Sequence, residues 1–169
     1  MDVSLINVGT PYYFHAYKTT NQTISNATYT DITDLIIDGN ASTTAATGDF
    51  ASNSWTPPAG VYFVSATMKI APPATGTTVS SSNITRIIFV LADSANNQIR
   101  SSDQMNEENS SGEDIYGMAL NINTILYANG TTTYKLRAWT RRNPAGDTRI
   151  IYGSGTRRDT TFNAFKLDN

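Results

Sequence analysis

The segment that decides the fold of this chain is residues 55–70, whose sequence is WTPPAGVYFVSATMKI. After Gly60 the apolar residues recur at every second position, which is the period of a β-strand. Prolines and a glycine precede the run and two further prolines follow it, and such residues commonly bound strands. We therefore predict a strand over residues 61–70 whose core face consists of Tyr62, Val64, Ala66, Met68 and Ile70.

Six further segments show strand-like patterns of apolar and polar residues. They are residues 12–18, 85–92, 118–127, 134–141, 149–152 and 160–167. Asn129 and Gly130 tolerate the positive φ of a tight turn, so residues 118–141 are predicted to form two antiparallel neighbours. Residues 29–38 fit either a helical turn or a short buried strand. The whole pattern predicts an all-β protein, built as a two-sheet antiparallel sandwich or jelly roll.

The composition of the 169-residue chain excludes several kinds of chemistry. The absence of cysteine excludes disulfide bonds, thiol nucleophiles and thiolate metal sites, and the single histidine excludes sites built from several histidines. No glycine motif for a dinucleotide or a phosphate is present, so we predict no enzyme and no cofactor. Threonine, asparagine and serine supply 56 residues, which suits a β-protein with a neutral polar surface.

Charge and hydropathy argue against two classes of partner. The formal net charge is -2 and no basic arm is visible, so we expect no binding to nucleic acid. No run approaches the ~20 apolar residues of a membrane helix, and the first residues lack the basic and apolar regions of a secretion signal. We therefore expect neither membrane insertion nor a visible secretion signal.

Four short motifs occur in an order that resembles the C1q and tumour necrosis factor jelly-roll superfamily. They are Phe14-His15-Ala16, Gly48-Asp49-Phe50, residues 55–64 and the closing residues 161–167. The resemblance implies a trimeric jelly roll of about ten strands. It implies a single domain over residues 11–169, preceded by residues 1–10 as an arm or a connection to a stalk or capsid.

The chain departs from that superfamily at two places. Ala164 stands where the closing strand usually has glycine, and residues 129–131 replace the usual Gly-Asp before the late strand. These departures argue against the animal complement branch. The polar surface and the missing cysteines are more similar to members found on phage and virus particles.

Apolar residues on both faces of predicted strands indicate a covered outer face. Val61 and Phe63 lie opposite the core face of their strand, and Trp139 shares its face with charged residues. A symmetric copy of the chain is the simplest cover. The candidate trimer-interface residues are Phe14, His15, Val61, Phe63, Trp139 and Phe162.

The basic residues late in the chain are candidate contacts for an anionic partner. Such a partner is an acidic glycan, a lipopolysaccharide phosphate or an acidic neighbouring subunit. The alternative is that these residues lie on ordinary solvated turns. The residues concerned are Arg141, Arg142, Arg149, Arg157 and Arg158.

Two polar segments, residues 72–83 and 101–114, are predicted as surface loops. The second is acidic and is the candidate recognition loop, with calcium binding as an alternative although its spacing does not match an EF-hand. A simple solvated loop is the third interpretation. Its acidic residues are Asp103, Glu107, Glu108, Glu113 and Asp114.

The function predicted from these features is a non-enzymatic structural protein at the virion surface. It would be the trimeric head of a fibre or a capsid decoration protein, with other virion proteins as partners and a host glycan or protein receptor as its target. The alternatives are an extracellular C1q-like lectin or ligand-binding module and, less favoured because a basic arm is missing, an icosahedral shell subunit.

Overall fold

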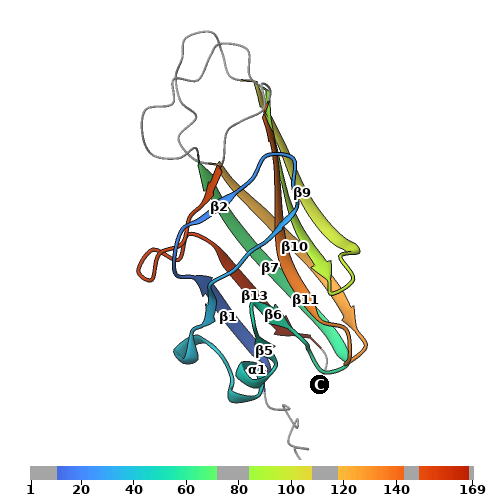
Figure 1. Cartoon of the computed structure of the whole chain (residues 1–169). Coiled ribbons are helices and arrows are strands. Elements are labelled where there is room, and N and C mark those ends of the chain that lie inside the picture. Colours follow the sequence, from blue (N-terminus) through green and yellow to red (C-terminus); the bar gives the residue numbers. More distant parts are fainter. Residues whose placement is uncertain (1–10, 72–83, 108–117, 143–148, 168–169) are drawn as a thin grey trace, which may run out of the picture.

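The computed structural model describes residues 11–71, 84–107, 118–142 and 149–167. These residues form two antiparallel β-sheets packed face to face, as Figure 1 shows. Two short helical segments, η1 (Gly39–Ala41) and α1 (Thr44–Gly48), lie between strands near the beginning of the chain. The all-β, two-sheet jelly roll predicted from the sequence is confirmed.

The first sheet is built around one long strand, β7 (Gly60–Ala71). On one side β7 pairs along its length with β10 (Met118–Ala128), and on the other it pairs with two strands. These two strands are β13 (Thr161–Lys166) and β12 (Arg149–Ile151). Beyond β13 lie β1 (Tyr13–Lys18) and then β4 (Leu35–Ile37), and beyond β12 lies β2 (Gln22–Ile24).

The second sheet is built around β11 (Tyr134–Arg142), which pairs with β8 on one side and with two short strands on the other. The far edge beyond β8 is β9, which follows β8 in the chain. The other strands of this sheet are β8 (Ile84–Asp93), β9 (Gln98–Glu107), β3 (Thr30–Asp31), β5 (Phe50–Ala51) and β6 (Ser54–Trp55).

The core lies between the sheets and contains a cluster of aromatic rings around Trp55. The indole ring centroid lies 5.0 Å from those of Phe14 and Tyr62 in the first sheet, and 6.1 Å from that of Tyr134 in the second. Trp55 is fully buried, and so is the predicted core face of β7. Burial of these large rings joins the two layers through the hydrophobic effect and edge-to-face packing.

The segment that fitted either a helix or a strand forms two short strands. β3 and β4 are separated by Asp34, whose φ of 56° is left-handed and breaks the run. Leu35 points into the core and is 5% exposed.

The prediction that residues 118–141 form a hairpin is wrong. β10 pairs with β7 in the first sheet, whereas β11 pairs with β8 in the second. Residues 129–133 therefore cross between the sheets. The Asn129 side chain accepts hydrogen bonds from the backbone nitrogens of Thr131 (3.0 Å) and Thr132 (2.8 Å), and Gly130 has a φ of 85°. The turn chemistry was correctly identified, but local turn residues do not decide which strand the next strand pairs with.

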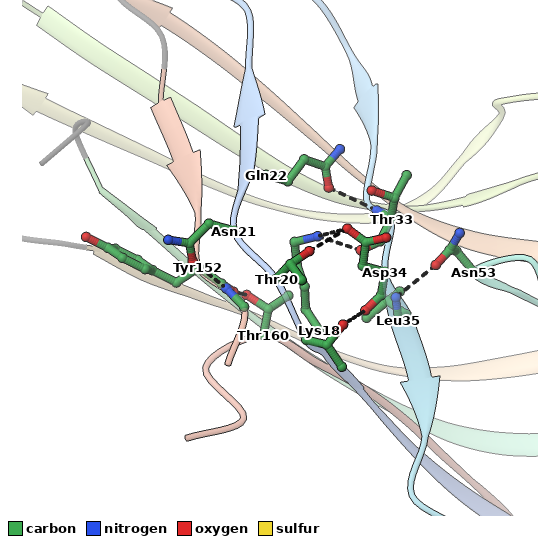
Figure 2. Close-up of polar contacts among 12 residues, drawn as sticks. Lys18, Thr20, Asn21, Gln22, Thr33, Asp34, Leu35, Asn53, Tyr152 and Thr160 are labelled. Carbon is green, nitrogen blue, oxygen red and sulfur yellow. Dashed lines mark hydrogen bonds and ion pairs between the residues drawn. The ribbon is translucent and has the colours of Figure 1, made fainter. Parts of the chain in front are cut away.

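The end of β1 is held in place by a buried lysine and a close backbone approach (Figure 2). The Lys18 amine donates to the Thr33 carbonyl oxygen at 2.6 Å and lies 3.7 Å from the Asp34 carboxylate. Gly153 lies close to the backbone of Thr20, just after β1, and its backbone nitrogen donates to the Asn21 side chain at 3.1 Å. These contacts connect β1 to two segments that are distant in the sequence.

Replacing Gly153 with alanine should destabilise this junction, because the new Cβ would lie 2.1 Å from the Thr20 carbonyl oxygen. That neighbour is backbone, so the chain itself must shift, at an expected cost of about 1–3 kcal/mol in the free energy of unfolding. Urea denaturation at a fixed protein concentration measures this loss. The matched control is Gly155→Ala, which meets no atom within 4 Å and should change stability by less than about 0.5 kcal/mol. Equal losses at both positions would contradict the packing described.

The buried Lys18 should make stability depend on alkaline pH. Burial lowers the pKa of its amine below the usual 10.5, and the Asp34 carboxylate opposes this only in part. Between the lowered pKa and 10.5 the unfolded chain binds more protons at this residue, so its contribution to the free energy of unfolding rises with pH. The difference in unfolding free energy between the wild type and Lys18→Met should therefore shift in favour of the wild type as the pH approaches 10.5.

Urea unfolding at a series of pH values tests this, with Lys166→Met as the control because that side chain is only partly buried. The prediction is contradicted if the difference in unfolding free energy between the wild type and Lys18→Met is the same at every alkaline pH. The Lys18 amine would then have the same pKa in the folded and the unfolded chain.

Candidate functional site

The outer face of the first sheet carries a continuous row of large apolar side chains. The antiparallel register places Tyr13 opposite Phe165, Phe165 opposite Phe63, and Phe63 opposite Ile125. Directly opposed residues project on the same side of a sheet, so the four side chains form one line across β1, β13, β7 and β10. Their exposed fractions are 37%, 48%, 41% and 47% in that order. We call these four residues the apolar row.

The apolar row is widened at one end and hollowed in the middle. Tyr127 is 78% exposed and lies opposite Val61, two residues after Ile125 on β10. A shallow hollow of about 250 Å³ lies over β1, β13 and β7. It is lined by Tyr13, Phe14, His15, Ala41, Phe63, Ser65, Asn163, Ala164 and Phe165. The face thus offers both a recess and projecting side chains on its β10 edge.

The next positions along the same face are polar. His15 and Asn163 are hydrogen-bonded through Nδ1 and Oδ1, and the Asn163 amide nitrogen donates to the Ser65 carbonyl oxygen at 3.2 Å. The His15 ring also stacks on Tyr17, with ring centroids 6.1 Å apart. Its Nε2 is buried and, in the part of the chain that the structure describes, has no hydrogen-bond partner. The apolar row is therefore bordered by the hydrogen-bonded side chains of His15 and Asn163.

The six predicted interface residues are divided among three places. His15, Val61 and Phe63 lie on the outer face of the first sheet. Phe14 and Phe162 are 2% and 0% exposed and pack on each other in the core at 5.2 Å, so their prediction as interface residues is wrong. Their neighbours Tyr13 and Phe165 face outward instead. Trp139 belongs to the other sheet and cannot share an interface patch with Phe63.

The outer face of the second sheet is charged and aromatic. Trp139 packs against Tyr29 with ring centroids 6.2 Å apart, and the Arg137 guanidinium lies 5.3 Å from the Tyr29 ring centroid. Asp31 accepts hydrogen bonds from Lys135 and Arg137, each at 2.7 Å. Burial raises the pKa of the Asp31 carboxyl, but these two cations outweigh it and hold the pKa below its usual value. Tyr29 thus packs beside Trp139, which stays partly exposed.

The five predicted arginines do not form one site. Arg141 is exposed on β11, whereas Arg149 is only 5% exposed on β12, so its prediction as a surface contact is wrong. Arg157 and Arg158 lie in the turn before β13, and Arg158 pairs with Asp38 and lies over the Tyr17 ring at 5.0 Å. The Arg142 side chain lies outside the described part of the structure.

The acidic segment is only partly a loop. Residues 101–107 belong to β9, so the prediction of a loop from residue 101 is wrong there, because these residues pair with β8 along their length. Asp103 on this strand is ion-paired with Arg86, which the sequence analysis did not single out. Glu107 is the last residue of β9. Glu108, Glu113 and Asp114 lie outside the described residues, and so do residues 72–83.

A second hollow, of about 390 Å³, lies near the beginning of β7. Its only charged lining residue is Asp49, whose carboxylate accepts a 2.7 Å hydrogen bond from the Tyr12 hydroxyl. Burial raises the pKa of that hydroxyl well above its usual value. The other polar side chains of its lining are the hydroxyls of Ser54, Thr56 and Thr133.

In the part of the chain that the structure describes, no group of three histidine, aspartate or glutamate side chains is placed to hold a metal ion. No helix among the elements described is long and apolar enough to span a membrane.

Comparisons with known proteins show the fold of the chain. No family model matches the sequence, and no curated protein matches it. The structure of the Eiger tumour necrosis factor from S. frugiperda is similar, with 12% identity, coverage of 94% of each chain and a TM-score of 0.58.

The globular domain of the zebrafish complement 1qA protein is also similar. It has 12% identity and a TM-score of 0.52, and the match covers 95% of this chain and 99% of that domain. At this level of identity the likeness establishes architecture only. The chain has the C1q and tumour necrosis factor-like jelly-roll fold that its sequence motifs resemble.

Proposed function

We propose that this protein is a non-enzymatic structural and attachment module, a homotrimeric jelly-roll head of a virion fibre or a capsid decoration protein. The observation that carries the proposal is the apolar row on the first sheet, together with the neighbouring Tyr127. Large contiguous apolar side chains at the surface of a soluble domain mark an interaction site. A second copy of the chain is the occupant that we propose.

The shape of this face supports a threefold rather than a twofold assembly. A twofold interface joins a patch to itself, whereas a threefold ring joins two different patches on every copy. The first sheet provides both: the hollow between Tyr13, Phe63 and Phe165, and the side chains of Ile125 and Tyr127 on β10. Among the described strands β10 pairs only with β7, so it is an edge strand of the first sheet.

The proposal of a non-enzymatic role is supported by the fold. The structural neighbours are modules of the tumour necrosis factor and C1q type. Placement at a virion surface is supported by composition, because a chain rich in threonine, asparagine and serine and without cysteine resembles the members of the superfamily found on phage and virus particles. Burial of the apolar row between copies would supply stability that disulfides provide in other surface proteins.

Light scattering coupled to size-exclusion chromatography should detect a species of about 55 kDa, three times the 18.4 kDa chain. Ile125→Asp should reduce the mass toward that of the single chain, because it places a carboxylate within the buried row. The matched control is Ile99→Asp on β9 of the other sheet. The two isoleucines are exposed to similar extents, 47% and 41%.

The control should keep the trimer mass. A wild-type monomer would reject the proposed assembly. Dissociation by Ile99→Asp, with Ile125→Asp still trimeric, would place the interface on the second sheet instead.

An antibody raised against the purified chain should label intact particles from the same source when these are imaged by electron microscopy. Labelling of particles is expected because the proposed module is exposed at their surface. Antigen found only in the particle-free supernatant would favour the extracellular lectin alternative and reject the virion assignment.

A further inference from the structure

The outer face of the second sheet brings two guanidinium groups together. The register of β11 and β8 places Arg141 directly opposite Arg86. Like charges in this position repel each other. Asp103 on β9 partly relieves the repulsion, because its carboxylate accepts hydrogen bonds from the Arg86 Nε at 3.1 and 3.0 Å. Arg141 is exposed and makes no ion pair with any residue that the structure describes.

Aromatic rings lie beside this pair of arginines. Trp139 precedes Arg141 by two positions on β11, so both side chains project on the same face. Tyr29 packs against Trp139 and is itself 41% exposed. We call these two rings and the two arginines, Arg86 and Arg141, the aromatic–arginine patch.

The charges of this face differ in sign from those of the chain as a whole. Around the patch, Lys135 and Arg137 share the single carboxylate of Asp31, whereas the carboxylate of Asp103 pairs with Arg86 alone. Among the side chains that the structure describes on this face, cations therefore outnumber carboxylates, although the net charge of the chain is -2. The excess positive charge favours an anionic ligand.

We propose that the aromatic–arginine patch binds a saccharide that carries a carboxylate. A carboxylate matches the planar fork of an arginine and can take two parallel hydrogen bonds from Arg141. The apolar face of a sugar ring can pack on Tyr29 and Trp139. Asp31 and Asp103, which are 47% and 39% exposed at their side chains, can accept hydrogen bonds from sugar hydroxyls.

The two carboxylates also decide against a polyphosphate partner. A nucleic acid would bring several phosphates onto a face where Asp31 and Asp103 repel them. A hydroxylated ligand with one negative charge uses the arginines and the carboxylates together. This mixture of groups therefore fits an acidic sugar better than a polyanion.

The site deepens the proposed attachment function and rests on it for its biological role. Its geometry does not depend on the trimer, because the patch lies on the second sheet and the proposed interface on the first. Assembly through the apolar row leaves the patch accessible on every copy. Three such sites on one trimer would strengthen the weak binding of each single site through avidity.

Isothermal titration of the purified chain with 3′-sialyllactose, and with lactose as the uncharged probe, tests the proposal. The acidic sugar should bind and lactose should bind at least tenfold more weakly. Arg141→Gln should weaken binding of the acidic sugar by about tenfold or more, the expected loss for a hydrogen bond to a charged group. Tyr29→Ala should also weaken it, through loss of ring packing.

The matched control is Arg100→Gln, which makes the same charge change at an exposed arginine of β9 outside the patch. Its affinity should stay within about twofold of the wild type, since long-range charge is screened by salt. Equal affinity for both sugars, no binding, equal losses in both arginine variants, or binding of a sulfated oligosaccharide alone would each overturn the proposal.

Light scattering on the same samples separates this proposal from the assembly. A monomer that binds the acidic sugar through Arg141 would reject the trimer and support the site. A trimer that fails to bind would reject the site alone.

Discussion

The fact that one strand carries apolar side chains on both faces constrains the rest of this structure. β7 has hydrogen-bonded partners on both sides, so it has no free edge, and its inner side chains fill the core against the second sheet. A two-layer domain covers only one face of each sheet. Phe63, on the other face, therefore stays exposed in the single chain. The central strand thus contributes side chains both to the core and, through Phe63, to the apolar row.

Sequence alternation could predict the faces of β7 but not those of β1 and β13. In β7 the polar residues mark the outer face over most of its length. In β1 aromatic residues stand at consecutive positions, so the pattern does not say whether Tyr13 or Phe14 faces the core. Phe162 and Phe165 are three positions apart and thus lie on opposite faces of β13. The predicted interface residues Phe14 and Phe162 are therefore the buried members of the pairs Tyr13–Phe14 and Phe162–Phe165.

The remaining features depend on contacts that no local pattern encodes. Arg86 and Arg141 are adjacent only because β8 and β11 pair in one register, and Tyr29 reaches Trp139 only because β3 pairs with β11. The burial of Lys18 likewise requires Thr33, Asp34 and the backbone near Gly153 to converge. Strand positions follow from local periodicity, whereas sheet partners and side-chain clusters follow from long-range packing. Most of the fold was therefore predictable from the sequence, whereas most of the outer face of the second sheet was not.

The two outer faces differ in the kind of interaction that they favour. Apolar burial is non-directional and grows with the area removed from water, which suits a permanent contact between copies. Charged and aromatic groups give specificity and are partly screened by salt, which suits reversible recognition. Because the faces lie on opposite sides of the sandwich, neither contact obstructs the other. Assembly on one side can therefore multiply weak recognition on the other without any change in the shape of the single chain.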